Sequence, residues 1–97
     1  MELRNLITFT HVAELGSFTK AAELLGYSQS TISFQIKQLE DELGCLLFER
    51  INHTITLTEK GREVLEYAQK VSHLTEEFKQ KNVLQQFFHL YMFWINF

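Results

Sequence analysis

The chain has 97 residues, of which 45% are hydrophobic, and a formal net charge of −3 at pH 7. A chain of this length can bury one modest core, and small domains often gain stability from a partner subunit. Its single cysteine, Cys45, excludes an intrachain disulfide, fits a reducing cytoplasm and has apolar neighbours that favour a packing role over a reactive thiol. The first residues mix acid and base, so we expect no signal peptide.

Two short helices joined by a tight turn are predicted between residues 17 and 44. Ser17 can cap the first helix, and Gly26 stands where a left-handed residue would end it. Ser28 can cap the second helix, and Gly44 can end it. Small Ala22 would let the two helices cross closely, as a helix-turn-helix requires. An ordinary helical hairpin without a DNA role is the alternative that this segment leaves open.

The second of these helices carries two different faces. The residues predicted to be buried recur at spacings of three and four: Ile32, Ile36, Leu39 and Leu43. The opposite side displays Ser30, Ser33, Phe34 and Lys37. A short helix packed by one face, with small hydrogen-bonding side chains on the other, is suited to the major groove of DNA.

A two-stranded hairpin is predicted directly after this helix. Residues 46–48 are apolar, residues 52–54 are polar, and Ile55 and Leu57 alternate with threonines. A hairpin in this place is a wing, which commonly lies along the DNA backbone or the minor groove. Arg50 and His53 are the wing residues that could meet phosphate, although Arg50 could instead pair with Glu40 inside the domain.

With these elements in one register, the chain resembles the DNA-binding domain of the LysR-type transcriptional regulators over about residues 3–75. The matching residues are Phe9, Val12, Ala13, Ser17, Phe18, Ala21, Ala22, Ser28, Gln29, Ser33, Ile36, Leu39, Glu40, Leu43, Gly44, Leu47, Phe48, Arg50, Leu57, Thr58 and Gly61. The resemblance implies a mainly α fold: a winged helix-turn-helix of three helices and a two-stranded wing, followed by a long linker helix that pairs two protomers. It also implies sequence-specific binding to promoter DNA.

The chain departs from the family pattern in several places. Phe34 stands where the family usually carries a basic residue, and Asn52 and His53 stand where it tends to carry arginine. Family members are several times longer, because an effector domain that resembles sugar-binding proteins follows the linker helix. We therefore expect no effector domain, and no pocket for a small-molecule effector, within this chain.

The residues expected to contact DNA are Lys20, Ser28, Gln29, Ser30, Ser33, Phe34, Lys37, Arg50 and His53. Gln29 can bridge the N6 and N7 atoms of adenine, whereas Ser28 is better explained as the helix cap. Lys20 and Lys37 are candidates for phosphate contacts. Two explanations stay open for Phe34: contact with a thymine methyl group, or drift in a chain no longer selected for DNA binding.

The charge balance counts mildly against a nucleic-acid role. Residues 1–60 carry five Lys or Arg against eight acidic residues, a net charge of −3, whereas DNA-binding domains are usually basic. The acids cluster at the far end of the second helix-turn-helix helix and at the base of the wing: Glu40, Asp41, Glu42 and Glu49. We therefore expect DNA binding that is weak and salt-sensitive.

A linker helix is predicted after Thr58, a plausible N-cap. Its apolar residues form one stripe, for which a second copy of the chain is the simplest partner: Val64, Ala68, Val71, Leu74 and Phe78. Packing of the stripe onto its own domain is the alternative. We divide the chain into a winged helix-turn-helix domain (1–58), a linker and dimerisation helix (59–82) and an aromatic tail (83–97). The tail is too short to span a bilayer, and it fits either a dimer clasp or the remnant of a truncated gene.

The sequence contains no pattern that is typical of a catalytic site. The four histidines are scattered, without cysteine or carboxylate at metal-ligand spacing, and no glycine-rich phosphate loop occurs. We therefore expect no enzyme activity, no cofactor, no metal and no membrane association. The predicted function is a cytoplasmic homodimeric transcriptional regulator that binds double-stranded DNA at an inverted-repeat promoter site. The alternatives are a dimerisation module that antagonises full-length relatives, and a truncated remnant.

Overall fold

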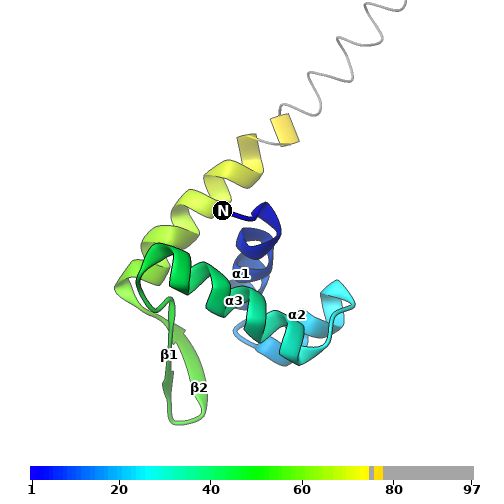
Figure 1. The fold of residues 1–97 in the computed structure, drawn as a ribbon, viewed down its shortest axis with the longest axis vertical. Coiled ribbons are helices and arrows are strands. Elements are labelled where there is room, and N and C mark those ends of the chain that lie inside the picture. Colours follow the sequence, from blue (N-terminus) through cyan, green and yellow to red (C-terminus); the bar gives the residue numbers. More distant parts are fainter. Residues whose placement is uncertain (75, 78–97) are drawn as a thin grey trace, which may run out of the picture.

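The computed structural model describes residues 1–74, 76 and 77. Three helices come first: α1 (Leu3–Leu15), α2 (Phe18–Leu25) and α3 (Gln29–Leu43). Strands β1 (Phe48–Ile51) and β2 (Thr54–Leu57) then form an antiparallel hairpin, and residues 59–74 and 76–77 form a fourth helix, the linker helix (Figure 1). The predicted winged helix-turn-helix is confirmed, while Phe78 and the aromatic tail lie outside the described residues.

The helix boundaries follow the residues predicted to set them. Ser17 Oγ accepts a hydrogen bond from the backbone N–H of Lys20 at 3.1 Å, and Ser28 Oγ accepts one from that of Thr31 at 3.2 Å. Gly26 ends α2 with a φ of 73°, a left-handed conformation that glycine adopts without a steric cost. These local signals set both ends of α2 and the start of α3.

The core lies where the three helices meet. Its buried members are Phe9, Val12, Ala21, Ala22, Ile32, Ile36, Leu39 and Leu47. The Phe48 ring of β1 contacts the rings of Phe9 and Phe18, with centroid distances of 5.3 and 5.7 Å. Val64 and Leu65 of the linker helix pack against the same cluster, as does the partly buried Cys45. One core therefore holds the hairpin and the start of the linker helix to the three helices.

Two side-chain hydrogen bonds join α1 to α3. Thr8 Oγ1 donates to Gln35 Oε1 at 2.6 Å, and Asn5 Nδ2 donates to Gln38 Oε1 at 3.1 Å. Asn5, Thr8 and Gln35 are all buried. Because a buried polar group without a partner costs about 1–3 kcal/mol, these bonds favour one rotation of α3 against α1.

A hydrogen-bond network around Leu47 joins α3 to the hairpin and to the linker helix. Glu40 Oε2 accepts a bond from the Leu47 N–H at 2.8 Å, and the Leu47 carbonyl accepts one from the Thr58 N–H at 3.0 Å. Thr58 Oγ1 donates to the Leu46 carbonyl and accepts from the Gly61 N–H at 2.9 Å, so Thr58 caps the linker helix as predicted. Gly61 permits this close approach, because a Cβ there would overlap the Leu47 carbonyl oxygen.

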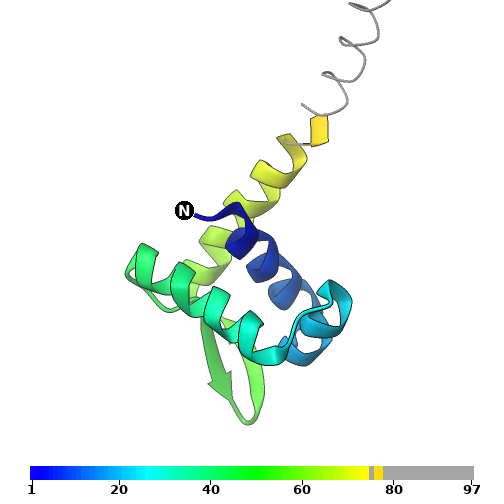
Figure 2. The ribbon, with the colours of Figure 1, turned by 45° about the vertical axis from the view of Figure 1, so that its right-hand side comes forward.

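The linker helix and the hairpin project from the body in roughly opposite directions, with α3 crossing between them (Figure 1). Figure 2 shows α1 running alongside the linker helix, with the N-terminus close to it. Among the described residues, no helix combines the length and the apolar character that crossing a membrane requires. Because the linker helix points away from the hairpin, one side of the molecule exposes α3 and the hairpin, and another side exposes α1 and the linker helix.

Candidate nucleic-acid interface

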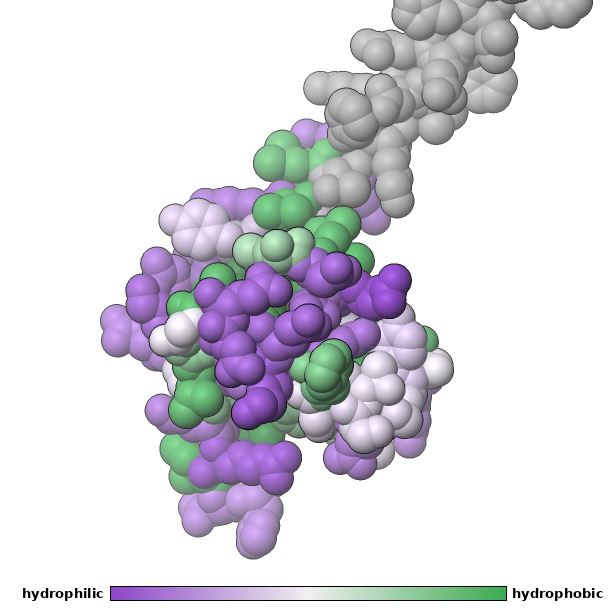
Figure 3. Space-filling model, viewed as in Figure 1, coloured by the Kyte–Doolittle hydropathy of each residue, from purple (hydrophilic) through white to green (hydrophobic). Residues whose placement is uncertain are grey.

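α3 buries one face and presents the other to solvent. The buried side holds Ile32, Ile36 and Leu39, which are at most 3% exposed. Leu43, also predicted to be buried, is 38% exposed because the last turn of α3 extends past the core. The residues predicted for the outer side are all exposed: Ser30, Ser33, Phe34 and Lys37. Figure 3 shows that the surface over α3 is mostly hydrophilic, while hydrophobic side chains gather on the linker helix and beside the hairpin.

Three hydroxyl groups lie close together at the amino end of α3. The Ser28 hydroxyl, which caps the helix, also lies 2.9 Å from the Thr31 hydroxyl and 3.1 Å from that of Ser30. Ser28 and Ser30 are thus engaged with one another inside the chain. Gln29 is exposed at the first position of α3, and its side chain makes no hydrogen bond to any described residue. Its amide can therefore both donate to a ligand and accept from one.

The hairpin closes through a two-residue turn. Asn52 and His53 have positive φ angles of 52° and 65°, as the central residues of a type I′ turn do. Thr54, predicted to belong to the polar tip, instead pairs with Ile51 as the first residue of β2. The tight turn matches the twist of the strands and leaves His53 exposed at the end of the wing.

Arg50 lies on the side of the hairpin that faces the start of α2. Its guanidinium carbon is 5.9 Å from the centroid of the Phe18 ring, within range of a cation–π interaction. The alternative pairing of Arg50 with Glu40 is not present: no ion pair joins the two side chains, and the Glu40 carboxylate accepts the Leu47 N–H. Arg50 thus stays exposed, and its charge is not neutralised by an ion pair with any described residue.

An open groove runs between α3 and the hairpin. Ser33 of α3, Arg50 of β1 and Phe18 of α2 all line it, so the fold brings two of the predicted DNA-contacting residues to one depression. Lys37 lies in a separate groove toward the carboxyl end of α3, near Asp41. The expected residues therefore spread along α3 and the wing and do not converge on one pocket.

The acidic residues of α3 occupy its carboxyl-terminal half, as the sequence predicts. Asp41 is exposed one turn after Lys37, and Glu42 lies 3.7 Å from the amino terminus of the chain. Gln29 and Ser33 stand at the other half of the helix, away from this negative charge. Within residues 1–74, 76 and 77, no three His, Cys, Asp or Glu side chains gather as metal ligands.

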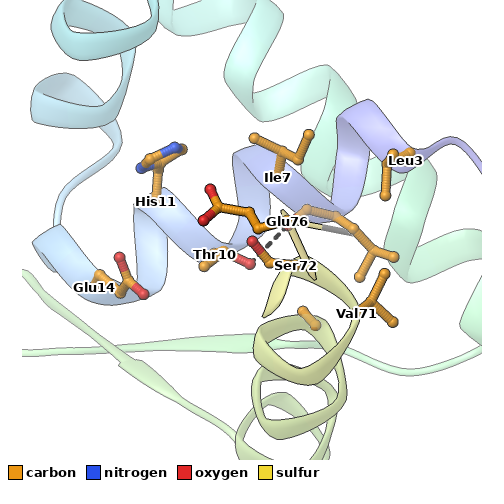
Figure 4. A pocket seen from close by; sticks show the side chains of 10 residues that line it. Leu3, Ile7, Thr10, His11, Glu14, Val71, Ser72 and Glu76 are labelled. Carbon is orange, nitrogen blue, oxygen red and sulfur yellow. Dashed lines mark hydrogen bonds between the residues drawn. The ribbon is translucent and has the colours of Figure 1, made fainter. Parts of the chain in front are cut away.

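A second groove, of about 360 Å³, lies between α1 and the linker helix (Figure 4). Leu3 and Ile7 line it from α1, and Ala68 and Val71 line it from the linker helix. Leu3 is 50% exposed and Ile7 is 45% exposed. This side of the molecule therefore offers apolar surface from two elements.

The predicted dimerisation stripe is covered by its own domain at its start and exposed further along the linker helix. Val64 packs on the core and Ala68 is only 5% exposed, so the first two stripe residues pack onto their own domain. Val71 and Leu74 are 40% and 61% exposed, and Phe78 lies outside the described residues. The stripe thus leaves the cover of its own domain partway along the helix.

Sequence reasoning did not identify the contribution of α1 to this surface. Leu3 and Ile7 are four residues apart and share one side of a helix, whereas Phe9 and Val12 define a different, buried side. The spacing of Leu3 and Ile7 is the signal that indicates a second apolar side of α1.

The family profile described as "Bacterial regulatory helix-turn-helix protein, lysR family" matches residues 3–62. The chain belongs to this LysR family. It is 51% identical over 79 residues to YwqM of Bacillus subtilis, named an uncharacterized HTH-type transcriptional regulator. It is 44% identical over 80 residues to the RuBisCO operon transcriptional regulator of Allochromatium vinosum. These matches cover 81% and 82% of this chain but only 27% and 26% of the relatives, so the chain spans about a quarter of their length.

Solved structures of LysR-family regulators share the fold. The DNA-binding domain of BenM, in complex with catB site 1 DNA, is 39% identical with a TM-score of 0.81, covering 84% of this chain and 91% of that one. The DNA-binding domain of CbnR, also in complex with DNA, is 38% identical with a TM-score of 0.79, covering 84% and 94%. The family resemblance read from the sequence is confirmed, and its relatives are transcriptional regulators.

Proposed function

We propose that this chain binds double-stranded DNA with sequence preference, as the DNA-binding part of a bacterial transcriptional regulator acting in the cytoplasm. The observation that carries the proposal is the two-sided α3, buried along Ile32, Ile36 and Leu39 and exposed along its other face. The similarity to domains solved on DNA supports placing that face in the major groove.

Base contacts are assigned to Gln29 and Ser33, whose side chains are exposed in the first half of α3. Phosphate contacts are assigned to exposed groups of α2, α3 and the wing: Lys20, Lys37, Arg50 and His53. Ser28 and Ser30 order the amino end of α3 through their mutual hydroxyl contact, and both remain exposed to a ligand there. With so few cations, affinity depends on the base contacts and falls readily with salt.

We also propose that two copies of the chain form a homodimer. The exposed apolar residues that line the second groove are Leu3, Ile7 and Val71, and Leu74, also exposed, lies one turn further along the linker helix. A two-fold interface would use this surface twice and cover it on both protomers. Two domains related in this way recognise two inverted half-sites, whose centres lie about 10 base pairs apart or at multiples of that spacing.

A selection from random duplex DNA tests the proposal. The chain is incubated with the pool at about 50 mM and about 200 mM salt, and bound duplexes are recovered by gel shift and sequenced. We expect one inverted-repeat sequence to be enriched at both concentrations, because base contacts do not depend on counterion release. Recovery without enrichment of any sequence contradicts sequence-specific binding.

A module that pairs with longer LysR-type relatives is the second candidate. It is favoured by the net charge of −3 over residues 1–60 and by Phe34 at a position where the family usually carries a basic residue. This candidate requires only the α1 and linker-helix surface. It predicts that the chain, mixed with a full-length relative, forms heterodimers in sedimentation and lowers DNA binding by that relative, while selection yields no site for the chain alone.

A further inference from the structure

Phe34 is the large apolar side chain in the middle of the α3 face that is proposed to meet DNA. It is 65% exposed, whereas Phe9 and Phe18 each contact the Phe48 ring at the core. No other described ring or cation lies against Phe34. Its ring thus lies on the surface of α3 and is mostly open to solvent.

The neighbours of Phe34 leave room for a ligand to approach the ring. Ser30 lies one turn before it on the exposed side, Ser33 directly precedes it, and Lys37 follows one turn later. Two of these three side chains are short, so they do not shield the ring. Lys37 is the single cation of α3, so this face has few charge contacts to make with DNA. An apolar contact by Phe34 would therefore be a substantial part of its binding.

The major groove of unmodified DNA displays one apolar group, the C5 methyl of thymine. We propose that Phe34 recognises a thymine through this methyl group, which makes Phe34 a specificity-determining residue. The inference rests on the proposed function, because it requires α3 to enter the major groove. A phenylalanine also has no hydrogen-bonding group for a guanine or a phosphate, so the contact favours thymine over every other standard base.

Replacing thymine by deoxyuridine removes this methyl and leaves Watson–Crick pairing unchanged. In the selected site, each thymine is replaced in turn, and binding is measured for the unchanged full chain. We expect one position in each half-site to lose affinity by about fourfold, the factor that corresponds to burying one methyl group. Replacement in both half-sites together should cost about 15-fold.

Phe34→Ala provides the decisive comparison. The variant should bind the thymine site more weakly than the unchanged chain and should bind thymine and uracil at that position equally well. Phe34→Leu, which keeps an apolar side chain, should retain part of the discrimination. Leu24→Ala is the matched control, because Leu24 is an exposed apolar residue of α2 at 61% exposure, and it should keep the full thymine preference. A cytosine at the same position should bind poorly, and 5-methylcytosine should recover part of the loss.

Each other outcome overturns the inference in a distinguishable way. A chain that selects a site but binds its uracil forms equally well has sequence-specific binding without a methyl contact. A uracil effect that persists in Phe34→Ala assigns the methyl to another residue. A Phe34→Ala chain that sediments as a monomer would make Phe34 a subunit contact. Selection that enriches no site at all rejects the proposed function and this inference together.

Discussion

α3 and the linker helix are both amphipathic, but the domain covers their apolar sides to different extents. In α3, Ile32 and Leu39 are fully buried, so the core of the domain covers the apolar side of this helix. In the linker helix, exposure rises from 5% at Ala68 to 61% at Leu74. A helix whose apolar side is covered internally can offer its polar side to a ligand, whereas one that is left partly uncovered has apolar surface for a partner to bury.

This comparison separates two kinds of surface on one small domain. The exposed face of α3 has polar groups that can discriminate among hydrogen-bonding partners, and Gln29 and Ser33 stand there. The groove beside the linker helix is walled by Leu3 and Ile7, whose burial is favourable but non-directional. Changes on the two surfaces should therefore have separable effects on DNA sequence preference and on subunit association.

The largest effect is expected from Val71→Glu combined with Leu74→Glu. Like charges in an apolar seam should yield monomers, since each glutamate of one protomer would meet apolar groups or glutamates of the other. Monomers lose the effective concentration that links two half-sites, so affinity for the selected site should fall by about 100-fold or more. Sedimentation velocity and gel shift measure the two effects.

Lys60→Glu is the control for that double substitution. It changes the net charge by the same two units, at a side chain that is 65% exposed and ion-paired with Glu63 at 3.4 Å near the start of the linker helix. It should leave the dimer intact. A dimer that survives Val71→Glu with Leu74→Glu would place the subunit contact elsewhere.

The next largest effect concerns the junction between the two helices. Gly61→Ala should destabilise the fold by about 2 kcal/mol, because the new methyl group forces the linker helix away from the Leu47 carbonyl. Gly16→Ala separates crowding from backbone conformation, since Gly16 has a φ of 64° and open space around it. It should cost only about 1 kcal/mol, the lower end of the penalty for a side chain in the left-handed region. Urea denaturation compares the variants, and equal losses would argue against crowding at the junction.

Gln29→Ala and Lys37→Ala distinguish a base contact from a phosphate contact on α3. Gln29→Ala should lower affinity by about tenfold and relax the preference at one base pair in each half-site. Lys37→Ala should weaken binding to all sequences alike and reduce the slope of log affinity against log salt by about one unit per protomer. A repeated selection with each variant checks both, and a Gln29→Ala chain with unchanged preference would refute the base contact.

The smallest effect is expected between α1 and α3. Thr8→Val should cost about 1 kcal/mol, because the buried Gln35 side chain loses its donor at 2.6 Å. Thr8→Val with Gln35→Leu should recover most of the loss, since both polar partners are then gone. Thr10→Val is the matched control, because the Thr10 hydroxyl donates only to the Leu6 carbonyl in its own helix. Stability that is unchanged in Thr8→Val would show that the bond does not restrain α3.

The sequence predicted the local elements well because their signals are local. Ser17 and Ser28 cap helices by accepting N–H groups three residues later, so spacing alone reveals them. The buried side of α3 follows the helical period, except at Leu43, where the period cannot show that the core has ended. The position of the wing was predicted as well, but Thr54 was assigned to the tip because a polar residue can occupy either a turn or a strand.

The sequence by itself thus determined the order of the helices, their caps, the hairpin and the two sides of α3, all of which depend on neighbours within about one helical turn. Only the tertiary structure decided which partners distant residues choose. Glu40 binds the Leu47 N–H and not Arg50, Gln35 is buried against Thr8, and the apolar stripe is covered at Ala68 but exposed at Leu74. These outcomes depend on distances between elements that touch in space, which the helical period of one segment does not contain.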